Sequence, residues 1–383
     1  MEITDLLSKY RKRIEFNYNK QKLIFDTHPS LFSSIAVDKG TFQLINSLRK
    51  NYLIKIDKVL DLGCGLGTIG IFLKKNYEDS GVHCVDRDAL ALEFTKHNAR
   101  LNNCEIKVYP SLDYSDIKEK FNLICCNYPA KAGINVLKKF VYDASRHLCS
   151  EGIFAVVIVK ELLGDFKKIL RNEIEIVYQT GSSGHYVFHL QYKKEISFDG
   201  DPYFRRELFY KLDGEDYLLK TAFNIPEFDS LSFTTQATIG LIKNIKKSEG
   251  VCVFEPCQGH LPIAVFYYWK LSKLNLVSRD LLSLKYAKDN LAFNGFTNVE
   301  TNHKIFADGK FGDLLIWRLD DDIELHQFEA EYEKARNFFK EIIIGGNKIK
   351  INRILKHFKL KTFGEKEDGN AKAAMMGNLR LEK

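Results

Sequence analysis

The stretch Val59-Leu-Asp-Leu-Gly-Cys-Gly-Leu-Gly-Thr68 decides the fold of this chain of 383 residues. Its apolar start predicts a β-strand that ends at the acidic residue Asp61, and residues 69–75 have the apolar pattern of a helix. Three glycines alternate along the loop between them: Gly63, Gly65 and Gly67. Because glycine lacks a Cβ, such a loop lets bare backbone approach a nucleotide-like ligand. A phosphate has no use for a carboxylate at the strand end, so Asp61 favours a ligand that carries positive charge.

Two further apolar runs end in polar residues at spacings that fit a parallel sheet. Residues 82–85 read Val-His-Cys-Val and lead into Asp86, which lies 25 residues after Asp61 (86 − 61). An acidic side chain at the end of a second strand can accept hydrogen bonds from the ribose hydroxyls of an adenosine. A third run, residues 121–126, leads into Asn127-Tyr-Pro-Ala130. Strands that alternate with helices in this way predict an α/β fold with a parallel sheet.

The three strand ends resemble the signature of class I S-adenosylmethionine-dependent methyltransferases. The resemblance rests on Asp61 with its glycine loop, on Asp86, and on the Asn-x-Pro-x sequence that begins at Asn127. It implies a Rossmann-like domain with a seven-stranded sheet and S-adenosyl-L-methionine as the cofactor. The alternative is an ordinary Rossmann-like unit in which Asp86 faces solvent and Pro129 occupies a turn.

The composition is that of an ordinary globular protein, with 45% hydrophobic and 28% charged residues. The length exceeds the size at which a single core stops growing, so two domains are expected. No run approaches the ~20 apolar residues of a membrane span, and the N-terminus lacks the pattern of a signal peptide. The eight cysteines form no Cys-x-x-Cys pair, so they indicate neither a zinc site nor a disulfide framework. We therefore expect a cytoplasmic protein without a metal.

The charge of the chain allows nucleic-acid binding without requiring it. The net charge is +7 and the pI is about 8.7, which is below the value of about 9 that marks a nucleic-acid-binding domain. Basic residues cluster at Arg205-Arg206 and in the tail at Lys348, Lys350, Arg353, Lys356, Lys359 and Lys361. Each cluster is equally compatible with a solvated surface.

The chain contains an internal duplication. Residues 88–102 read DALALEFTKHNARLN and residues 280–294 read DLLSLKYAKDNLAFN, a separation of 192 (280 − 88). Upstream, residues 59–65 align with Val253-Phe-Glu-Pro-Cys-Gln-Gly259 at a separation of 194 (253 − 59). We therefore predict two tandem Rossmann-like methyltransferase domains, residues 1–195 and residues 196–383.

On this alignment the second copy has lost the residues that carry the chemistry. The changes are Gly63 to Cys257, Gly67 to Leu261, Asp86 to Ser278, and Asn127-Tyr-Pro to Arg318-Leu-Asp320. The pattern of helices and strands survives while the residues at the strand ends do not. We therefore predict that the first domain is catalytic and that the second is a degenerate copy that serves as a platform for the substrate.

The segment before the glycine loop narrows the resemblance. Pro29-Ser-Leu-Phe-Ser33 and Asp38-Lys-Gly-Thr41 resemble the stretch that precedes the same motif in bacterial ribosomal RNA guanine-N2 methyltransferases. Those enzymes also contain two copies of the fold, but their N-terminal copy is the degenerate one. The resemblance implies RNA, either ribosomal or transfer RNA, as the substrate, with no membrane partner. The alternatives are a protein glutamine amide, a small molecule, or cofactor binding without turnover.

Asn127, Tyr128 and Pro129 are the expected catalytic residues. The lone pair of an exocyclic amino group on a purine is delocalised into the ring, so the nitrogen is a poor nucleophile. The Asn127 side-chain oxygen and a backbone carbonyl of the Tyr128-Pro129 segment would accept hydrogen bonds from this group and favour its rehybridisation. Pro129 fixes φ and so holds that carbonyl in place.

The expected cofactor contacts lie at the strand ends and at the preceding helix start. They are Thr41, Asp61, Gly63, Gly65, Gly67, Asp86, Asp113 and Asn127. Thr41 would approach the methionine carboxylate, because a helix N-terminus stabilises an anion. The family pattern places the adenine contact at Leu112, which is apolar, so we assign it to the adjacent Asp113.

The fourth position of the Asn-x-Pro-x motif departs from the family. Amino-methylating relatives have an aromatic residue there that stacks on the target base, whereas this chain has Ala130. Either Tyr128 or another ring, such as Phe32, supplies the stacking, or the acceptor is not a planar base. If neither ring stacks, Tyr128 is a packed turn residue.

Overall fold

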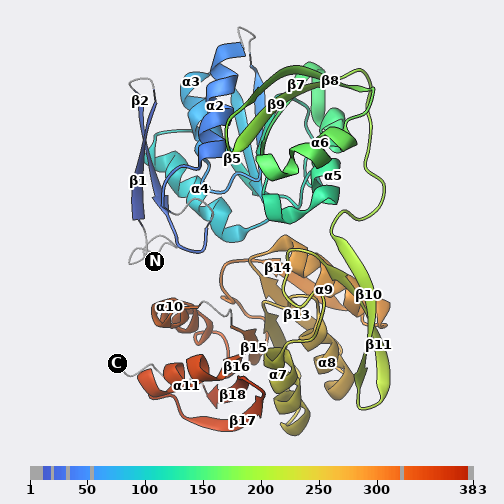
Figure 1. Cartoon of the computed structure of the whole chain (residues 1–383). Coiled ribbons are helices and arrows are strands. Elements are labelled where there is room, and N and C mark those ends of the chain that lie inside the picture. The colour runs from blue at the N-terminus through green and yellow to red at the C-terminus, as the bar shows by residue number, and fades with distance from the viewer. Residues whose placement is uncertain (1–11, 19–20, 32–34, 52–55, 320–322, 378–383) are drawn as a thin grey trace. The chain divides into compact units, whose positions relative to one another are not determined.

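The computed structural model describes residues 12–18, 21–31, 35–51, 56–319 and 323–377. The chain divides into two compact units, residues 1–203 and residues 204–383. Each unit contains a seven-stranded sheet flanked by helices, and a separate two-stranded hairpin precedes it in the chain (Figure 1). The predicted α/β fold with two tandem copies is confirmed.

The first unit is built on a sheet with the strand order β5-β4-β3-β6-β7-β9-β8. The strands are β3 (Lys58–Leu62), β4 (Gly81–Asp86), β5 (Lys107–Pro110), β6 (Phe121–Asn127), β7 (Leu148–Val159), β8 (Ile174–Gly181) and β9 (His185–Tyr192). The first five are parallel, and β9 runs antiparallel between β7 and β8. Strands β8 and β9 form the antiparallel hairpin that closes the sheet. The order in which strands are added reverses at β3: β4 and β5 lie on one side of it, and β6 and β7 lie on the other. Open α/β sheets bind ligands at such a point.

Five helices cover the two faces of this sheet. They are α2 (Lys39–Asn51), α3 (Thr68–Asn76), α4 (Ala89–Leu101), α5 (Ile134–His147) and α6 (Leu163–Ile169). Helices α2, α3 and α4 pack in sequence on one face, and α5 packs against α6 on the other. Gly67 begins α3 with a φ of +79°, and Asp88 caps α4 by accepting a hydrogen bond from the Leu90 amide.

The first unit continues beyond residue 195, where we placed the end of the first domain. The Ser145 side chain bonds to both the amide and the carbonyl of Ile196, at 2.9 and 3.0 Å. The Asp143 carboxylate then accepts a hydrogen bond from the Phe198 amide at 2.8 Å. These contacts fasten residues 196–203 to α5, so the structural division falls after Tyr203.

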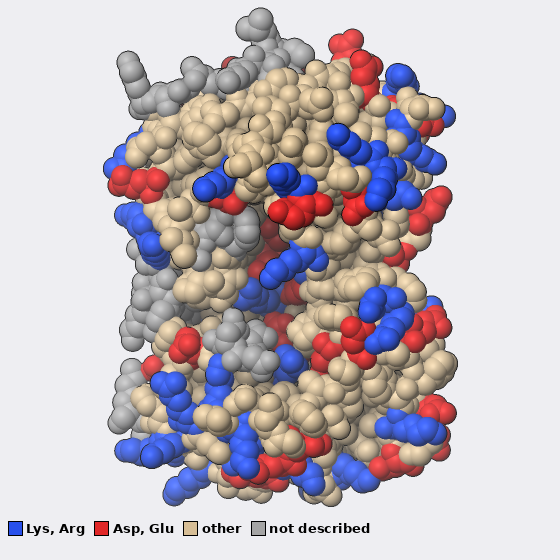
Figure 2. Space-filling view, viewed as in Figure 1, with Lys and Arg blue, Asp and Glu red and all other residues tan. Residues whose placement is uncertain are grey.

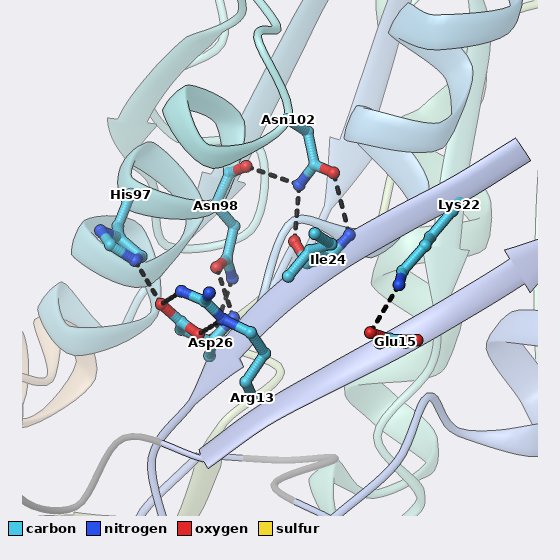
Figure 3. A network of polar contacts seen from close by, with 8 residues as sticks. All are labelled: Arg13, Glu15, Lys22, Ile24, Asp26, His97, Asn98 and Asn102. Carbon is cyan, nitrogen blue, oxygen red and sulfur yellow. Dashed lines mark hydrogen bonds and ion pairs between the residues drawn. The ribbon is translucent and has the colours of Figure 1, made fainter.

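Asn98 of α4 and Asn102, which caps the end of α4, hold the first hairpin, β1 (Lys12–Tyr18) and β2 (Gln21–Thr27), against the unit (Figure 3). The Asn98 side chain bonds to the amide and carbonyl of Asp26 at 2.8 and 3.1 Å. Asn102, one turn later, bonds in the same way to Ile24 at 2.9 and 2.6 Å. Because side chains four residues apart lie on one face of a helix, the pair mimics the edge of a strand. Asn98 also donates to the carbonyl of Leu66 within the glycine loop, at 3.0 Å.

The second unit repeats this architecture with the strand order β14-β13-β12-β15-β16-β18-β17. Its strands are β12 (Val251–Phe254), β13 (Leu274–Ser278), β14 (Val299–His303), β15 (Leu314–Arg318), β16 (Glu341–Asn347), β17 (Thr362–Asp368) and β18 (Ala371–Gly377). Its helices are α7 (Phe233–Asn244), α8 (His260–Trp269), α9 (Leu281–Phe293), α10 (Leu325–Ala335) and α11 (Lys348–His357). One core joins the sheet to α7, α8 and α9, and a second joins its other face to α10 and α11.

The asparagine clamp is repeated in the second unit. Its hairpin consists of β10 (Phe204–Leu212) and β11 (Glu215–Ala222). Asn290 bonds to the amide and carbonyl of Lys220, both at 2.8 Å, and Asn294 bonds to those of Leu218 at 3.0 and 2.7 Å. This explains why these asparagines recur in the sequence at a constant separation.

One cross-strand ion pair, at the position bound by the first asparagine of each clamp, has opposite polarity in the two hairpins. In the first hairpin Arg13 faces Asp26, with an N–O distance of 2.8 Å. In the second hairpin Glu207 faces Lys220 at the same register, with an N–O distance of 3.1 Å. The cation therefore lies on β1 in one copy and on β11 in the other.

Among the described residues, no helix is long and apolar enough to cross a membrane. The described cysteines form no disulfide with one another, and no described cluster of three or more His, Cys, Asp or Glu side chains could hold a metal ion.

Candidate active site

The glycine loop leaves open space at two of its three glycines. Gly63 and Gly65 have φ values of +75° and +55°, and a Cβ added to either would meet no atom within 4 Å. A Cβ on Gly67 would instead lie 2.8 Å from Cγ2 of Thr95. Gly63 and Gly65 thus form a cradle of bare backbone, while the structure gives Gly67 a packing position against α4.

Asp61 lies in the interior beneath this loop, with 1% of its surface exposed. Its Oδ2 accepts a hydrogen bond from the Gly70 amide at 2.9 Å, and its Oδ1 is buried without a hydrogen-bond partner. Burial raises the pKa of Asp61 to about 7. Gly70, which our sequence analysis missed, permits this arrangement because a Cβ there would clash with Cys84. A buried carboxylate that lacks one partner favours a cationic or hydrogen-donating ligand.

Asp86 connects the end of β4 to the glycine loop. Its Oδ2 accepts from the Gly65 amide at 2.9 Å, and its Oδ1 accepts from the Asp88 amide at 3.0 Å. Burial, and secondarily the charge of Asp88, raises the pKa of Asp86 to about 6. Each oxygen retains a lone pair that can accept from a ligand hydroxyl.

Asn127 is held in one orientation at the end of β6. Its Nδ2 donates to Oδ2 of Asp38 at 3.0 Å and to Oγ1 of Thr41 at 2.9 Å. An ionised carboxylate only accepts, so the atom that faces Asp38 must be the amide nitrogen. The Asn127 Oδ1 is then directed away from these partners and has no hydrogen-bond partner among the described residues. The structure thus brings Thr41 and Asn127 together.

Asp38 contacts Asn127, although our sequence analysis quoted it only within the motif Asp38-Lys-Gly-Thr41 and gave it no role. Its carboxylate also accepts hydrogen bonds from the amides of Gly40 and Thr41, at 2.8 and 3.2 Å, and so caps α2. The same group therefore begins a helix and orients Asn127. An aspartate three residues before a helix threonine was the signal for the cap. No local pattern links it to Asn127, 89 residues away.

The Tyr128 ring is buried, which argues against the alternative in which it stacks on a base. The side chain is 3% exposed, its hydroxyl bonds to the Gly133 carbonyl, and its ring packs edge-on against Phe140 at 5.8 Å. Tyr128 is the packed turn residue of our alternative. The carbonyl of Pro129 accepts from the Ala132 amide at 2.9 Å, which leaves the Tyr128 carbonyl as the candidate backbone acceptor. Phe32, the other candidate ring, lies outside the described residues.

Asp113 lies after β5 but directs its carboxylate at its own turn. It accepts from the Tyr114 amide at 2.5 Å, and Lys139 of α5 lies 3.9 Å away. Burial raises the pKa of Asp113 to about 6 against the opposing charge of Lys139. The adjacent Leu112 is buried, and the adenine contact of Asp113 stays a prediction.

The matching loop of the second unit corrects our alignment of the two copies. The Gly63 and Glu255 amides both donate to the last valine carbonyl of the neighbouring strand, Val85 and Val277 respectively. The true separation at the loop is therefore 192 (255 − 63), not 194. Gly63, Gly65 and Gly67 correspond to Glu255, Cys257 and Gly259, and Asp61 corresponds to Val253. The pairing of Asp86 with Ser278 is correct.

The second loop keeps the backbone shape of the first but is filled by a side chain. Glu255 and Cys257 retain φ values of +56° and +51° although they are not glycines. The Glu255 carboxylate accepts from Ser278 Oγ at 2.7 Å and from the Arg279 amide at 3.1 Å. Arg318 ends β15 where Asn127 ends β6, since the Leu319 and Tyr128 amides both donate to the adjacent strand.

The fold and the loop define the class of the protein. Each unit has a seven-stranded sheet with one antiparallel strand, and a glycine loop or a related turn follows its central strand. The two units are therefore tandem class I methyltransferase folds. Residues 22–189 match the family described as the Methyltransferase small domain. This match lies within the first unit and covers less than half of the chain.

Named relatives match part of the chain. The chain is 33% identical over 154 residues to ribosomal RNA small subunit methyltransferase C of Psychromonas ingrahamii, covering 39% of this chain and 43% of the relative. It is 37% identical over 132 residues to the protein of the same name from Actinobacillus pleuropneumoniae, covering 34% of this chain and 40% of the relative. The chain thus spans less than half the length of these relatives.

One solved structure resembles the chain over nearly its whole length. It is the T. thermophilus 16S rRNA N2 methyltransferase RsmC, solved with AdoMet and guanosine. The TM-score is 0.69 at 13% identity, and the match covers 96% of this chain and 98% of that one. This likeness shows that the tandem arrangement of the fold is shared.

Proposed function

We propose that the first unit is an S-adenosylmethionine-dependent N-methyltransferase that acts on the exocyclic amino group of a guanine in small-subunit ribosomal RNA. The observation that carries the proposal is the orientation of Asn127. Asp38 and Thr41 hold its amide nitrogen, so its oxygen is presented as a hydrogen-bond acceptor at the carboxyl end of the sheet. An acceptor aimed at an amino group is the feature that this chemistry requires.

The residues of the glycine loop fit the cofactor. The open space at Gly63 and Gly65 allows close approach of a nucleoside, and Asp86 can accept from ribose hydroxyls. The unpartnered oxygen of Asp61 supplies negative potential beneath the loop. When bound, the cofactor supplies an electrophilic methyl group attached to a sulfonium.

The protein activates the acceptor by hydrogen bonding and positioning. Asn127 Oδ1 and the Tyr128 carbonyl accept the two hydrogens of the amino group, which draws its lone pair out of conjugation with the ring. Both acceptors are fixed before the substrate arrives, because Asp38 orients the side chain and the amide of Tyr128 is bonded to Val157 at 3.0 Å. Prepositioned polar groups of this kind contribute about 10²–10³ to a rate. Holding the nitrogen in line with its electrophile adds to this effect.

The assignment of RNA as substrate is supported by the names of the relatives and by the surface of the second unit. Basic side chains gather on the part of the molecule that contains α11 (Figure 2). The exposed members on and after this helix are Arg353, Lys356, Lys359 and Lys361. By contrast, Arg205 and Arg206 pair with Asp229 at 3.2 Å and 2.5 Å, which neutralises part of that cluster.

We assign the second unit the role of a degenerate copy that supports the substrate. The Glu255 side chain stands where Gly63 leaves open space in the first unit, and Val253 replaces the buried Asp61. Ser278 replaces Asp86 and donates its hydroxyl to Glu255 instead of accepting from a ligand. Each change removes a feature on which cofactor binding depends in the first unit.

The test is methyl transfer from tritiated cofactor to small-subunit RNA from cells that lack the gene. We expect Asn127→Ala to lower the rate by about 10²–10³. Asn122→Ala is the matched control, because Asn122 lies on the same strand at its other end and bonds only to the Lys58 amide in the described structure. An Asn127→Ala protein as fast as the wild type refutes the mechanism.

The same assay separates the other acceptor classes. Label that resists ribonuclease and is recovered in protein identifies a glutamine methyltransferase. Label in neither polymer, with cofactor consumed, identifies a small-molecule enzyme. Calorimetric cofactor binding without consumption identifies a binding protein. Mass spectrometry of the digested RNA then locates the methyl group on the guanine nitrogen or elsewhere.

A further inference from the structure

The imidazole of His185 lies beside Asn127 at the mouth of the proposed site. A Cβ placed on Gly40 would lie 2.8 Å from Oδ2 of Asp38, 3.1 Å from Cδ2 of His185 and 3.3 Å from Oδ1 of Asn127. The Asp38 carboxylate, the ring and the amide oxygen therefore surround the same point at the beginning of α2. Gly40 leaves this point open because it has no Cβ.

The register of the sheet places both side chains on one face. Asn127 of β6 pairs with Val157 of β7, and Val157 pairs with Val187 of β9. His185 is two residues before Val187 and pairs with Val159. Because side chains alternate between faces with a period of two, His185, Val187 and Asn127 project to the same side.

Helix α2 covers this face and leaves His185 at its rim. Deeper on β9, His189 is completely buried and its Nε2 lies 2.8 Å from Oγ of Ser47 on α2. At the carboxyl end, Gln43 of α2 donates to Ser182 of the β8–β9 turn at 2.6 Å. His185 lies between these two anchors and is half-buried. Helix α2 therefore no longer covers β9 at His185, which lies beside the site.

The backbone around His185 is fixed, but its ring is not engaged. The Ser182 amide donates to the His185 carbonyl at 2.9 Å, and the Lys160 amide donates to the Gly184 carbonyl at 2.9 Å. Among the described residues, the imidazole makes no hydrogen bond, ion pair or ring contact. An aromatic ring on a fixed backbone, without a partner and beside a fixed acceptor, is suited to a planar ligand.

We propose that the His185 ring stacks on the acceptor base and supplies the aromatic contact that Ala130 lacks. The proposal rests on the proposed function, since it concerns the base whose amino group Asn127 would bind. It also accounts for Tyr128, whose ring is buried and cannot reach a substrate. Aromatic side chains stack on unpaired bases in RNA-binding sites, and the imidazole of histidine is one of the rings used. The closing hairpin thereby becomes part of the substrate site.

The test compares His185→Ala with His185→Phe on small-subunit RNA. We expect His185→Ala to lower kcat/KM by about 10-fold to 100-fold, the effect of losing one base stack. His185→Phe keeps a flat ring and is expected to stay within about threefold of the wild type. The dissociation constant of the cofactor, measured by calorimetry without RNA, should be unchanged in both variants.

Each other outcome overturns the inference in a distinct way. If the wild type is active and His185→Ala has the same kcat/KM, the ring is not used, while the proposed function stands. If His185→Phe is as slow as His185→Ala, the imidazole acts by hydrogen bonding and not by stacking. Weaker cofactor binding in His185→Ala assigns the ring to the cofactor. A wild-type protein that methylates no RNA removes both the proposed function and this role for His185.

Discussion

The side-chain amide of Asn127 donates to the carboxylate of Asp38 at 3.0 Å, and this carboxylate also caps helix α2. We expect Asp38→Ala to lower kcat by about 10²–10³, because Asn127 loses the partner that fixes its oxygen toward the acceptor. Asp38→Asn keeps a good helix cap but a weaker bond to Asn127, so its loss should be smaller. Single-turnover methylation measures both. An unchanged kcat in Asp38→Ala would contradict this role of Asp38.

Gly65 and Cys257 occupy equivalent positions, with φ values of +55° and +51°. Because the second copy carries a side chain on this backbone, Gly65→Cys should fold with little loss of stability. The added side chain enters the open cradle, and we expect the cofactor affinity to fall by roughly 100-fold, about 2.7 kcal/mol. Titration calorimetry measures the affinity.

The reverse substitution, Cys257→Gly, is the control for Gly65→Cys. It should leave the cofactor affinity unchanged and the stoichiometry at one site per chain, because Glu255 still fills the second loop. Two sites per wild-type chain would show that the second unit still binds the cofactor.

The raised pKa of Asp61 predicts how the stability of the ligand-free protein varies with pH. Its pKa is about 7 in the folded protein, against 3.8 for the free side chain, so the folded state binds this proton more tightly. Stability should therefore fall as pH rises from about 4 to about 7, and Asp86 and Asp113 act in the same direction. For Asp61 the loss is at most roughly 4 kcal/mol, at about 1.4 kcal/mol per pKa unit.

Asp61→Asn should remove the part of this slope that Asp61 contributes, since the amide carries no charge at any of these pH values, and the parts due to Asp86 and Asp113 should remain. Above pH 7 the variant should melt at a higher temperature than the wild type. Asp79→Asn, which changes an exposed aspartate, controls for the net charge. Thermal unfolding at pH 5 and pH 8 measures the effect, and parallel curves for Asp61→Asn and the wild type would contradict it.

The two asparagine clamps provide an internal control for one another. Asn98 and Asn290 each make three hydrogen bonds to buried or part-buried backbone groups. Replacing either by Ala should destabilise its own unit by about 3 kcal/mol, because backbone groups are left unsatisfied. Only Asn98 bonds within a glycine loop that we expect to hold the cofactor. Asn98→Ala alone should therefore weaken cofactor binding, as measured by calorimetry beside urea unfolding.

The fold could be predicted because its markers are local. Asp61 and the glycines mark one strand end, and Asp86 and Asn127 mark two others. The correspondence between the two loops could not be predicted. Asp61 and Glu255 are chemically alike, so the sequences align them, but Glu255 lies two residues further along its loop than the true equivalent of Asp61. A shift of two residues preserves the alternation of a strand, so the hydrophobic pattern does not reveal it. Only the hydrogen bond of Glu255 to Val277 shows the true alignment.

The parts of the site that the sequence did not reveal depend on contacts between distant segments. Asp38 reaches Asn127 from the start of helix α2 and His185 from strand β9, and no spacing links them. Tyr128 was ambiguous for a different reason, because a tyrosine in a turn can face either the core or solvent. Its hydroxyl finds a carbonyl partner in the interior, which makes burial of the ring favourable.

The opposite polarity of the two hairpin ion pairs has a consequence for how a duplicated chain reaches its native state. Two similar hairpins in one polypeptide invite exchange, in which a strand of one copy pairs with a strand of the other during synthesis. If β1 paired with β11, Arg13 would face Lys220, and if β10 paired with β2, Glu207 would face Asp26. Both mismatches bring like charges together, and the second does so at a buried carboxylate. The inverted polarity thus favours strand pairing within each half and disfavours strand exchange between the halves.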